Sequence, residues 1–443
     1  MVRTRSAAKR FASKLSQELV DHIVDLLEDD TKSLKKLGLV SRSWSYRTRK
    51  HLFSIVTLRS REECLQLQMF TEHKPVLAHY ITSLALVSPG NDFGLGNIPW
   101  FGFCPIIIEM MSTMDSIEEV SIQGEEYRRF SWDYLSSAFQ LAFYDLVAQP
   151  QVRCLELKHQ FEVNVLPFVQ CHNLKSLLLT NVRVSPTYSM DTGACFPLNA
   201  PSFPTNDSDE EGRLEYLSFT DCDEAIRTML KCSRSAEGTL DLARPMELEV
   251  STLGYDKYTT AVRNACSSQV TTYNVTHSPE EIEFPFIKAF PSKIFDLSRL
   301  PLLQNLNVDI HSPKPTALTA LLDGLERLSV LRKDSPSDLD TVVLTFDLYP
   351  PSNDLDDNSD WDDIDITDDL NRLAYCYSIW ERMEKIMMRG AFANLEKLEL
   401  VFQFCFSMLD DPSTWDNAEA VMLRRMPRLN SKGVLKIRHE ADE

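Results

Sequence analysis

Near the N-terminus, apolar side chains recur with the spacing of a helix. Four of them follow an i, i+4, i+7, i+8 pattern that places them on one helix face: Leu19, Ile23, Leu26 and Leu27. Ser16 is a suitable N-cap, and Glu18 in the first turn suits the positive end of the helix dipole. The pattern therefore predicts a short amphipathic helix.

Two further short helical patterns follow. Ser33 can start a second helix that carries Leu34 and Leu37, and Ser41 can cap a third helix that holds Trp44. Helices this short are not stable in isolation, so they need one another or a partner. The spacing alone leaves two interpretations open, a small helical cap on a larger fold and a separate docking module.

The rest of the chain repeats a different pattern, L-x-x-L-x-L with apolar substitutions. It begins at eight positions: Ile81, Ile117, Val152, Leu174, Leu214, Leu303, Leu339 and Leu395. Weaker candidates begin at Leu248 and Val270. The spacing is less regular than in known repeat families. Single matches are common in a leucine-rich chain, but eight of them indicate a repeat.

Each repeat is predicted to be a short strand, with neighbours hydrogen-bonded in a parallel sheet. Helical patterns supply the return path, one through Leu135, Phe139, Phe143 and Leu146 and another through Leu373, Tyr377, Trp380 and Met387. The predicted fold class is α/β, with an N-terminal three-helix unit followed by an irregular leucine-rich-repeat solenoid whose parallel strands lie on the concave side. A doubly wound α/β domain would need a phosphate loop or a switch-point site, and the sequence contains neither.

The N-terminal sixty residues resemble the F-box, and most closely the large fungal group of F-box proteins. The matching positions are Leu15, Glu18, Leu19, Ile23, Leu27, Leu34, Leu37, Val40, Arg42 and Trp44, with Leu52 and Phe53 fitting the end of the motif. One position departs from the family, because Ser16 stands where a Pro is usual.

The resemblance implies a substrate-recognition subunit of a cullin–RING (SCF-type) ubiquitin ligase, which binds a Skp-type adaptor and, through it, a cullin. The alternative is a binding scaffold of the same fold without a ligase role. The expected adaptor-binding residues are Leu15, Ser16, Leu19, Ile23, Leu26, Leu37, Val40 and Trp44. The expected domains are a disordered basic tail (1–14), an F-box-like domain (15–60) and a solenoid (61–443) with an acidic insertion near 353–369.

Charge is divided unevenly along the chain, whose formal net charge is -19. Residues 1–60 carry 13 Lys and Arg against 6 Asp and Glu, and the remaining residues carry 33 against 59. So acidic a body argues against nucleic acid as a partner, because neutralising phosphates needs a basic surface. The basic N-terminal region suits an acidic protein, which Skp-type adaptors are as a family.

Other compositional features predict a cytoplasmic or nuclear protein without membrane contact. No apolar run reaches membrane-spanning length, and the basic residues 1–14 lack the apolar stretch of a signal peptide. The ten Cys residues form no C-x-x-C pair, which favours reduced and mostly buried thiols.

The repeat geometry nominates a surface for a protein substrate. In an L-x-L strand the middle side chain faces away from the core. The predicted row is Glu156, Leu178, Ser218, Asn307, Val343 and Glu399, flanked by Lys158, Tyr216, Asn305 and Lys397. Its mixed character favours a folded protein or a peptide over a polyanion.

The sequence predicts no catalytic residue, metal or cofactor, and therefore a non-catalytic subunit. Asp354, Asp356, Asn358, Asp360 and Asp365 fall at calcium-loop positions. However, the loop lacks its turn-forming Gly and its closing Glu, so a solvated acidic insertion is the interpretation. Two Cys and two His near one repeat match no zinc spacing: Cys154, His159, Cys171 and His172.

Overall fold

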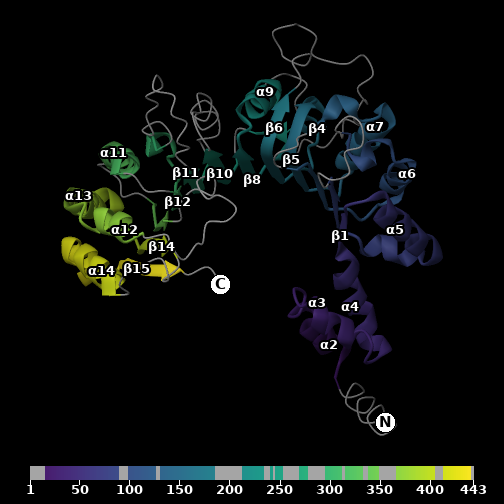
Figure 1. Cartoon of the computed structure of the whole chain (residues 1–443), viewed down its shortest axis with the longest axis horizontal. Helices are drawn as coiled ribbons and strands as arrows, with labels where there is room; N and C mark the ends of the chain where they lie inside the picture. Colours follow the sequence, from purple (N-terminus) through teal and green to yellow (C-terminus); the bar gives the residue numbers. More distant parts are fainter. Residues whose placement is uncertain are drawn as a thin grey trace. The chain divides into compact units, whose positions relative to one another are not determined.

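The computed structural model shows an α/β chain. It describes residues 15–88, 98–125, 130–184, 212–233, 240–242, 245–252, 269–277, 295–311, 315–332, 338–348, 366–404 and 413–440. Two compact units divide the chain: unit 1 (Met1–Gly212 with Glu237–Leu240) and unit 2 (Arg213–Ala236 with Asp241–Glu443). Each unit combines parallel strands with helices that connect them (Figure 1).

Unit 1 begins with three short helices, α2 (Gln17–Asp25), α3 (Thr31–Leu37) and α4 (Arg42–Ser54). Ser16 caps α2 as predicted, because its hydroxyl accepts from the Leu19 N–H at 3.4 Å. The expected start of the second helix at Ser33 is wrong. Asp30 is the N-cap, and its carboxylate accepts from the Ser33 N–H at 2.9 Å.

The three helices share a small core of their own. Val20, Val24, Leu34 and Trp44 are buried in it, and Ile23, Leu27, Leu37 and Leu52 pack partly against it. The predicted apolar face of the first helix is therefore partly wrong. Leu19 and Leu26 are exposed, because two valines of α2, offset from the predicted face, enter the core instead.

The strands of unit 1 pair in parallel in the order β1-β2-β3-β5-β6, with β4 beside β5. Their bounds are β1 (Ile55–Leu58), β2 (Ser83–Val87), β3 (Glu119–Gln123), β4 (Phe130–Ser131), β5 (Cys154–Val163) and β6 (Ser176–Val184). The intervening helices are α5 (Arg61–His73), η1 (Pro75–Tyr80), η3 (Trp100–Phe103), α6 (Pro105–Thr113), η4 (Trp132–Tyr134), α7 (Ser137–Val147) and α8 (Leu166–Val169).

The strands of unit 2 pair in parallel in the order β8-β10-β11-β12-β13-β14-β15. Their bounds are β8 (Tyr216–Thr220), β10 (Glu247–Thr252), β11 (Thr272–His277), β12 (Asn305–His311), β13 (Thr341–Asp347), β14 (Lys397–Gln403) and β15 (Leu435–Glu440). Two short strands, β7 (Gly212–Arg213) and β9 (Leu240–Asp241), fall where the chain divides.

The helices of unit 2 are α9 (Asp223–Ser233), η8 (Leu297–Arg299), α11 (Pro315–Leu331), α12 (Thr367–Ala374), α13 (Tyr377–Met387), η11 (Gly390–Phe392), α14 (Ser413–Arg425) and α15 (Pro427–Ser431). Helices α11, α13 and α14 lie along one side of strands β12 to β15 (Figure 1). In the described part of the chain, no helix is long and apolar enough to cross a membrane.

All eight predicted repeat starts lead into strands, namely β2, β3, β5, β6, β8, β12, β13 and β14, and the two weaker candidates form β10 and β11. The alternating apolar side chains, such as Leu155 and Leu157 in β5, are buried as predicted. The sequence pattern missed β1 and β15, which lie at the ends of the strand orders of units 1 and 2.

Successive repeats are equivalent in detail. In unit 1 the N–H groups of Glu118 and Glu119 both donate to the Thr82 carbonyl, and those of Arg153 and Cys154 both donate to the Glu118 carbonyl. The same paired bond recurs between consecutive strands of unit 2. Three equivalent positions after a strand core also share a positive φ: His159, Asn181 and Asp221. These recurring backbone bonds show that successive strands begin with the same local backbone geometry.

The predicted return helices are present with one boundary correction each. Phe139, Phe143 and Leu146 lie buried on α7, while buried Leu135 directly precedes this helix. The second predicted helix is two helices, α12 and α13, with Leu373 on the first and Tyr377, Trp380 and Met387 on the second. Tyr377 is exposed rather than buried.

Candidate protein-binding surfaces

The N-terminal helices leave an unusual amount of apolar surface in contact with solvent. Leu19 is 52% exposed, Leu26 72% and Val40 47%, and Leu15 is also exposed. These side chains are not needed for the core of the three helices, which Val20, Val24, Leu34 and Trp44 fill. Exposed leucines gathered on so small a unit are typical of a protein-binding surface.

One contact brings the start of α2 close to the segment that enters α4. The Gln17 side-chain amide donates to the Ser43 carbonyl at 3.1 Å and to the Asp21 carboxylate at 2.7 Å. Val40 and Leu39 lie directly before this segment, and Leu39 is 88% exposed. Apolar side chains at the start of α2 and in the connection between α3 and α4 therefore lie on segments that this contact joins.

An ion pair holds α2 against α4. The Arg47 guanidinium donates two hydrogen bonds to the Asp25 carboxylate at 2.6 and 2.8 Å, and the His51 ring lies 2.7 Å from the same carboxylate. The bonds from Arg47 are the main cause that lowers the pKa of Asp25 to about 2, with a smaller contribution from His51. This ion pair fixes the orientation of α2 relative to α4.

The predicted adaptor residues fall into two groups. Leu15, Ser16, Leu19, Leu26 and Val40 are exposed, whereas Ile23 and Leu37 are half-buried and Trp44 is buried. Trp44 was expected to form or support the adaptor-facing surface, and its indole fills the core of the three-helix unit. Sequence reasoning missed Leu39, although its position after Gly38, at the end of α3, was a usable signal.

The strands of unit 1 have one face with half-exposed side chains, which we call the open face. Glu156 and Leu178 are register partners on this face, as predicted. The Ser121 hydroxyl donates to the Glu156 carboxylate at 2.7 Å, and the Lys158 ammonium pairs with it at 2.6 Å. Unit 1 therefore brings together three of the predicted substrate residues.

The open face of unit 2 carries the remaining seven: Tyr216, Ser218, Asn305, Asn307, Val343, Lys397 and Glu399. Amide side chains run across its middle, where Asn307 donates to Asn274 at 2.8 Å and Asn274 donates to Glu247 at 2.8 Å. Tyr216 donates to Glu249, a residue that the sequence reasoning did not select. The middle of this face is thus polar and internally hydrogen-bonded.

Glu399 corrects the prediction of an exposed row. Its side chain is buried at 3% exposure, because cationic side chains of its own strand and of β15 close over it. Burial of this carboxyl would by itself raise its pKa. Hydrogen bonds from Lys397, Arg438 and Lys436 outweigh that effect and lower the pKa to about 2.

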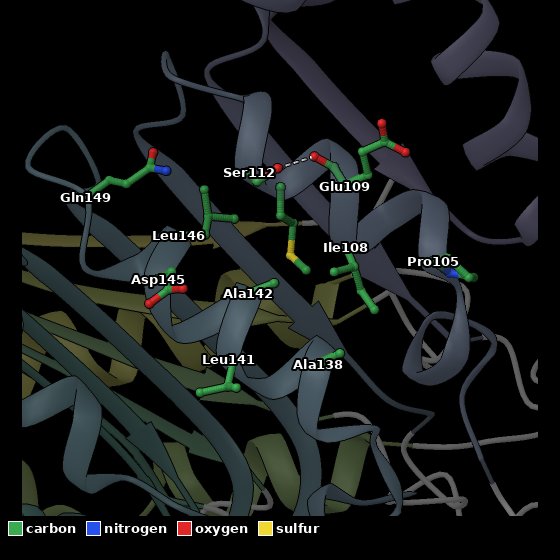
Figure 2. A pocket seen from close by; sticks show the side chains of 11 residues that line it. Pro105, Ile108, Glu109, Ser112, Ala138, Leu141, Ala142, Asp145, Leu146 and Gln149 are labelled. Atoms are coloured by element: carbon green, nitrogen blue, oxygen red, sulfur yellow. Dashed lines mark hydrogen bonds between the residues drawn. The ribbon is translucent and has the colours of Figure 1, made fainter. Parts of the chain in front are cut away.

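A separate groove of about 400 Å³ lies between α6 and α7 on the helical side of unit 1. Figure 2 shows Ile108, Leu141 and Leu146 among its apolar lining, with the carboxylates of Glu109 and Asp145 also at its edge. The Ser112 hydroxyl donates to the Glu109 carbonyl at 2.6 Å, a bond within α6. The groove is open and mostly apolar, and no basic residue lines it.

Metal chemistry has no arranged site in the described ranges, where no group of three or more His, Cys, Asp or Glu side chains is placed to hold an ion. The five residues at calcium-loop positions, Asp354 to Asp365, lie outside the described residues. So does the basic tail, 1–14.

Of the two Cys near the candidate cluster, Cys171 is buried, and burial raises its pKa to about 12, which is typical of an unreactive thiol.

Comparisons with known proteins add no assignment, since neither a protein-family model nor a curated protein matches this chain. The structure by itself shows the fold class, which is α/β with parallel strands, connecting helices and a small helical unit at its N-terminus.

Proposed function

We propose that this protein is the substrate-recognition subunit of a cullin–RING (SCF-type) ubiquitin ligase. Its N-terminal helices bind a Skp-type adaptor, and the adaptor joins it to a cullin. The observation that carries the proposal is the division of apolar side chains in α2. Val20 and Val24 complete the core of the three helices, while Leu19, at a position where the sequence resembles the F-box, and Leu26, at the C-cap of α2, stay exposed.

The body suits the second half of this role. Its repeated strands, with the same paired backbone bond from one strand to the next, support a leucine-rich-repeat-like solenoid. The Gln160 side chain donates to the Ile122 carbonyl of the neighbouring strand β3 at 2.8 Å, as a ladder position of such a repeat would. The open faces then hold a protein substrate.

In this proposal the chain contributes binding rather than chemistry. Holding a substrate near a ubiquitin carrier raises its effective concentration and accelerates transfer without a catalytic residue on the receptor. The described open faces carry mixed polar, apolar and charged side chains, which suits recognition of a folded protein surface or a peptide.

The direct test removes the exposed leucines of α2. The double variant Leu19→Ala/Leu26→Ala should lower capture of a purified Skp-type adaptor at least about tenfold, since interface anchors typically contribute ~2 kcal/mol each. A matched control is Val330→Ala/Leu331→Ala, which truncates two side chains of α11 that are 63% and 65% exposed. The control should capture adaptor as the wild type does.

The choice of residues keeps folding separate from binding. Ile23 packs against the core of the three helices, so its truncation would also destabilise them. Both double variants should unfold at the wild-type temperature, because the truncated side chains are exposed. Wild-type capture of the adaptor by Leu19→Ala/Leu26→Ala would contradict the assignment of this surface.

A scaffold without a ligase role is the second candidate, and Ser16 favours it. The F-box usually has Pro at this position, whereas Ser16 here caps α2 through its hydroxyl. Purification of the chain from its native cells separates the two functions. A ligase subunit brings both adaptor and cullin with it in stoichiometric amounts, and a scaffold brings neither.

A further inference from the structure

The last two strands of unit 2 place three cations around one buried carboxylate. On the open face of β14 and β15, the Glu399 carboxylate pairs with the ammonium of Lys397, with Lys436 at 3.3 Å and with the Arg438 guanidinium at 2.7 Å. Arg438 also pairs with Glu440. We call these three basic residues the cationic trio.

The residues of the cationic trio come from two strands, which their register brings side by side. Glu399 lies opposite Lys436 in the parallel pairing, and Val401 lies opposite Arg438. Side chains two residues apart on a strand point to the same face, so Lys397 and Glu399 share a face, as do Lys436 and Arg438. The sequence had selected Lys397 and Glu399 separately, and only the pairing of the strands adds the two residues of β15.

Charge within the cluster is not balanced by its own carboxylates. Three cations face Glu399, which is buried, and Glu440, which is 42% exposed. The side chains of Lys397 and Lys436 remain 45% and 60% exposed, and that of Arg438 36% exposed. The next strand, β13, presents neutral Thr341, Val343 and Thr345 on the same face, and its Asp347, opposite Gln403, pairs with His311. A net positive area therefore persists on a strongly acidic body.

We infer that the cationic trio docks a carboxylate-rich linear segment, rich in Asp and Glu, of the partner protein. The inference rests on the proposed function and specifies the chemistry of its substrate. Complementary charge supports this occupant, since the trio offers three partly exposed donors with ammonium and guanidinium geometry suited to carboxylates. Nucleic acid fits less well, because a body with 59 acidic against 33 basic residues would repel a phosphate backbone beyond this small area.

The test uses the full chain and a fluorescent peptide of about ten glutamates, followed by fluorescence anisotropy at low salt. Lys397→Gln/Lys436→Gln should weaken binding about tenfold. Lys231→Gln/Lys385→Gln removes the same charge from exposed positions on α9 and α13 and should leave affinity within about twofold of wild type. Because the two variants have the same net charge, a difference between them shows binding at a specific site and not general electrostatic attraction.

A variant of opposite sign sharpens the test. Glu399→Gln removes the carboxylate that occupies the trio, so it should strengthen binding of the glutamate peptide several-fold, while melting curves verify that the variant is folded. Wild-type affinity in Lys397→Gln/Lys436→Gln would overturn the inference. Equal weakening in both lysine pairs would overturn it too, and so would tighter binding of a single-stranded oligonucleotide of equal charge.

The result is independent of adaptor binding. Leu19→Ala/Leu26→Ala changes only the N-terminal helices, so it should bind the glutamate peptide as the wild type does. Failure of adaptor capture with intact peptide binding would therefore count against the proposed ligase role alone. Intact adaptor capture with no effect of the trio on peptide binding would count against this inference alone.

Discussion

Asp25 shows how much one side chain organises the N-terminal helices. Its carboxylate accepts from Arg47 and contacts His51, so a single residue of α2 is tied to two residues of α4. The pair is about one-third exposed, and an ion pair with that exposure contributes modestly to stability. Its main effect is to set the direction of α2, and with it the position of Leu19 and Leu26.

This ion pair predicts acid sensitivity of the N-terminal unit. The pKa of Asp25 is lowered from 3.8 to about 2 in the folded chain. A lowered folded pKa means that the stabilisation is fully present above pH 3.8 and is lost as pH falls towards 2. The protection factors of the α2 amides against exchange should therefore fall over that range in the wild type.

The variant Arg47→Ala supplies the control for this prediction. Without the guanidinium the pKa of Asp25 should lie near its usual value in the folded chain, so little pH-dependent stabilisation should remain and the acid-dependent change in α2 should shrink. Identical exchange profiles in wild type and Arg47→Ala would show that the pair does not hold the helix.

At the scale of elements, the close packing of α11 against Phe295 depends on a glycine, Gly324. A Cβ added to Gly324 in α11 would lie 1.8 Å from the Phe295 carbonyl oxygen. Real Cβ atoms do not approach so closely, so the helix could pack there only after a backbone shift. The glycine therefore sets how near α11 lies to the segment that leads into η8.

The variant Gly324→Ala should destabilise unit 2 by ~1–3 kcal/mol, the usual result of overpacking, despite the higher helix propensity of Ala. Gly390→Ala is the matched control, because a Cβ there would meet nothing within 4 Å. Denaturant unfolding of both variants measures the difference. Equal stability of the two would mean that α11 has room to move away from Phe295.

Repeated strands were the most predictable elements. Each of the eight starts carries two inward apolar positions after the first, and that local alternation is enough to specify a half-buried strand. Strand β1 was missed although Phe53, Val56 and Leu58 fit the repeat pattern, because Phe53 had been assigned to the end of the N-terminal helical motif and α4 runs directly into the strand at Ile55. Strand β15 was missed because Lys432 stands at the first position of the pattern, although Leu435 and Ile437 occupy the two positions that follow.

At the scale of the whole molecule, charge separates the two ends of the chain. Residues 1–60 carry an excess of cations, and the rest carries a larger excess of carboxylates. Electrostatic attraction of this kind accelerates encounter more than it deepens affinity, and it weakens when salt shortens the Debye length.

In the proposed ligase role, the association rate with an acidic Skp-type adaptor should therefore fall several-fold when NaCl rises from about 50 to about 300 mM, while the dissociation rate changes little. Stopped-flow mixing measures the first rate and competitive displacement the second. A variant in which Lys32, Lys35 and Lys36 are replaced by Gln should associate more slowly at low salt. A dissociation rate that carries the whole salt dependence would contradict this account.

Sequence alone determined the class of the elements, because the alternation of inward and outward positions in a strand is local and survives without knowledge of its neighbours. It also indicated a helical N-terminal unit, but the apolar side chains on and next to α2 cover a wider arc than the core of the three helices uses. Only packing against α3 and α4 decided that Val20 and Val24 are buried and that Leu19 and Leu26 are exposed. The cationic trio likewise required the tertiary structure, because strand register alone brings Lys436 and Arg438 to Glu399 from a distant part of the chain.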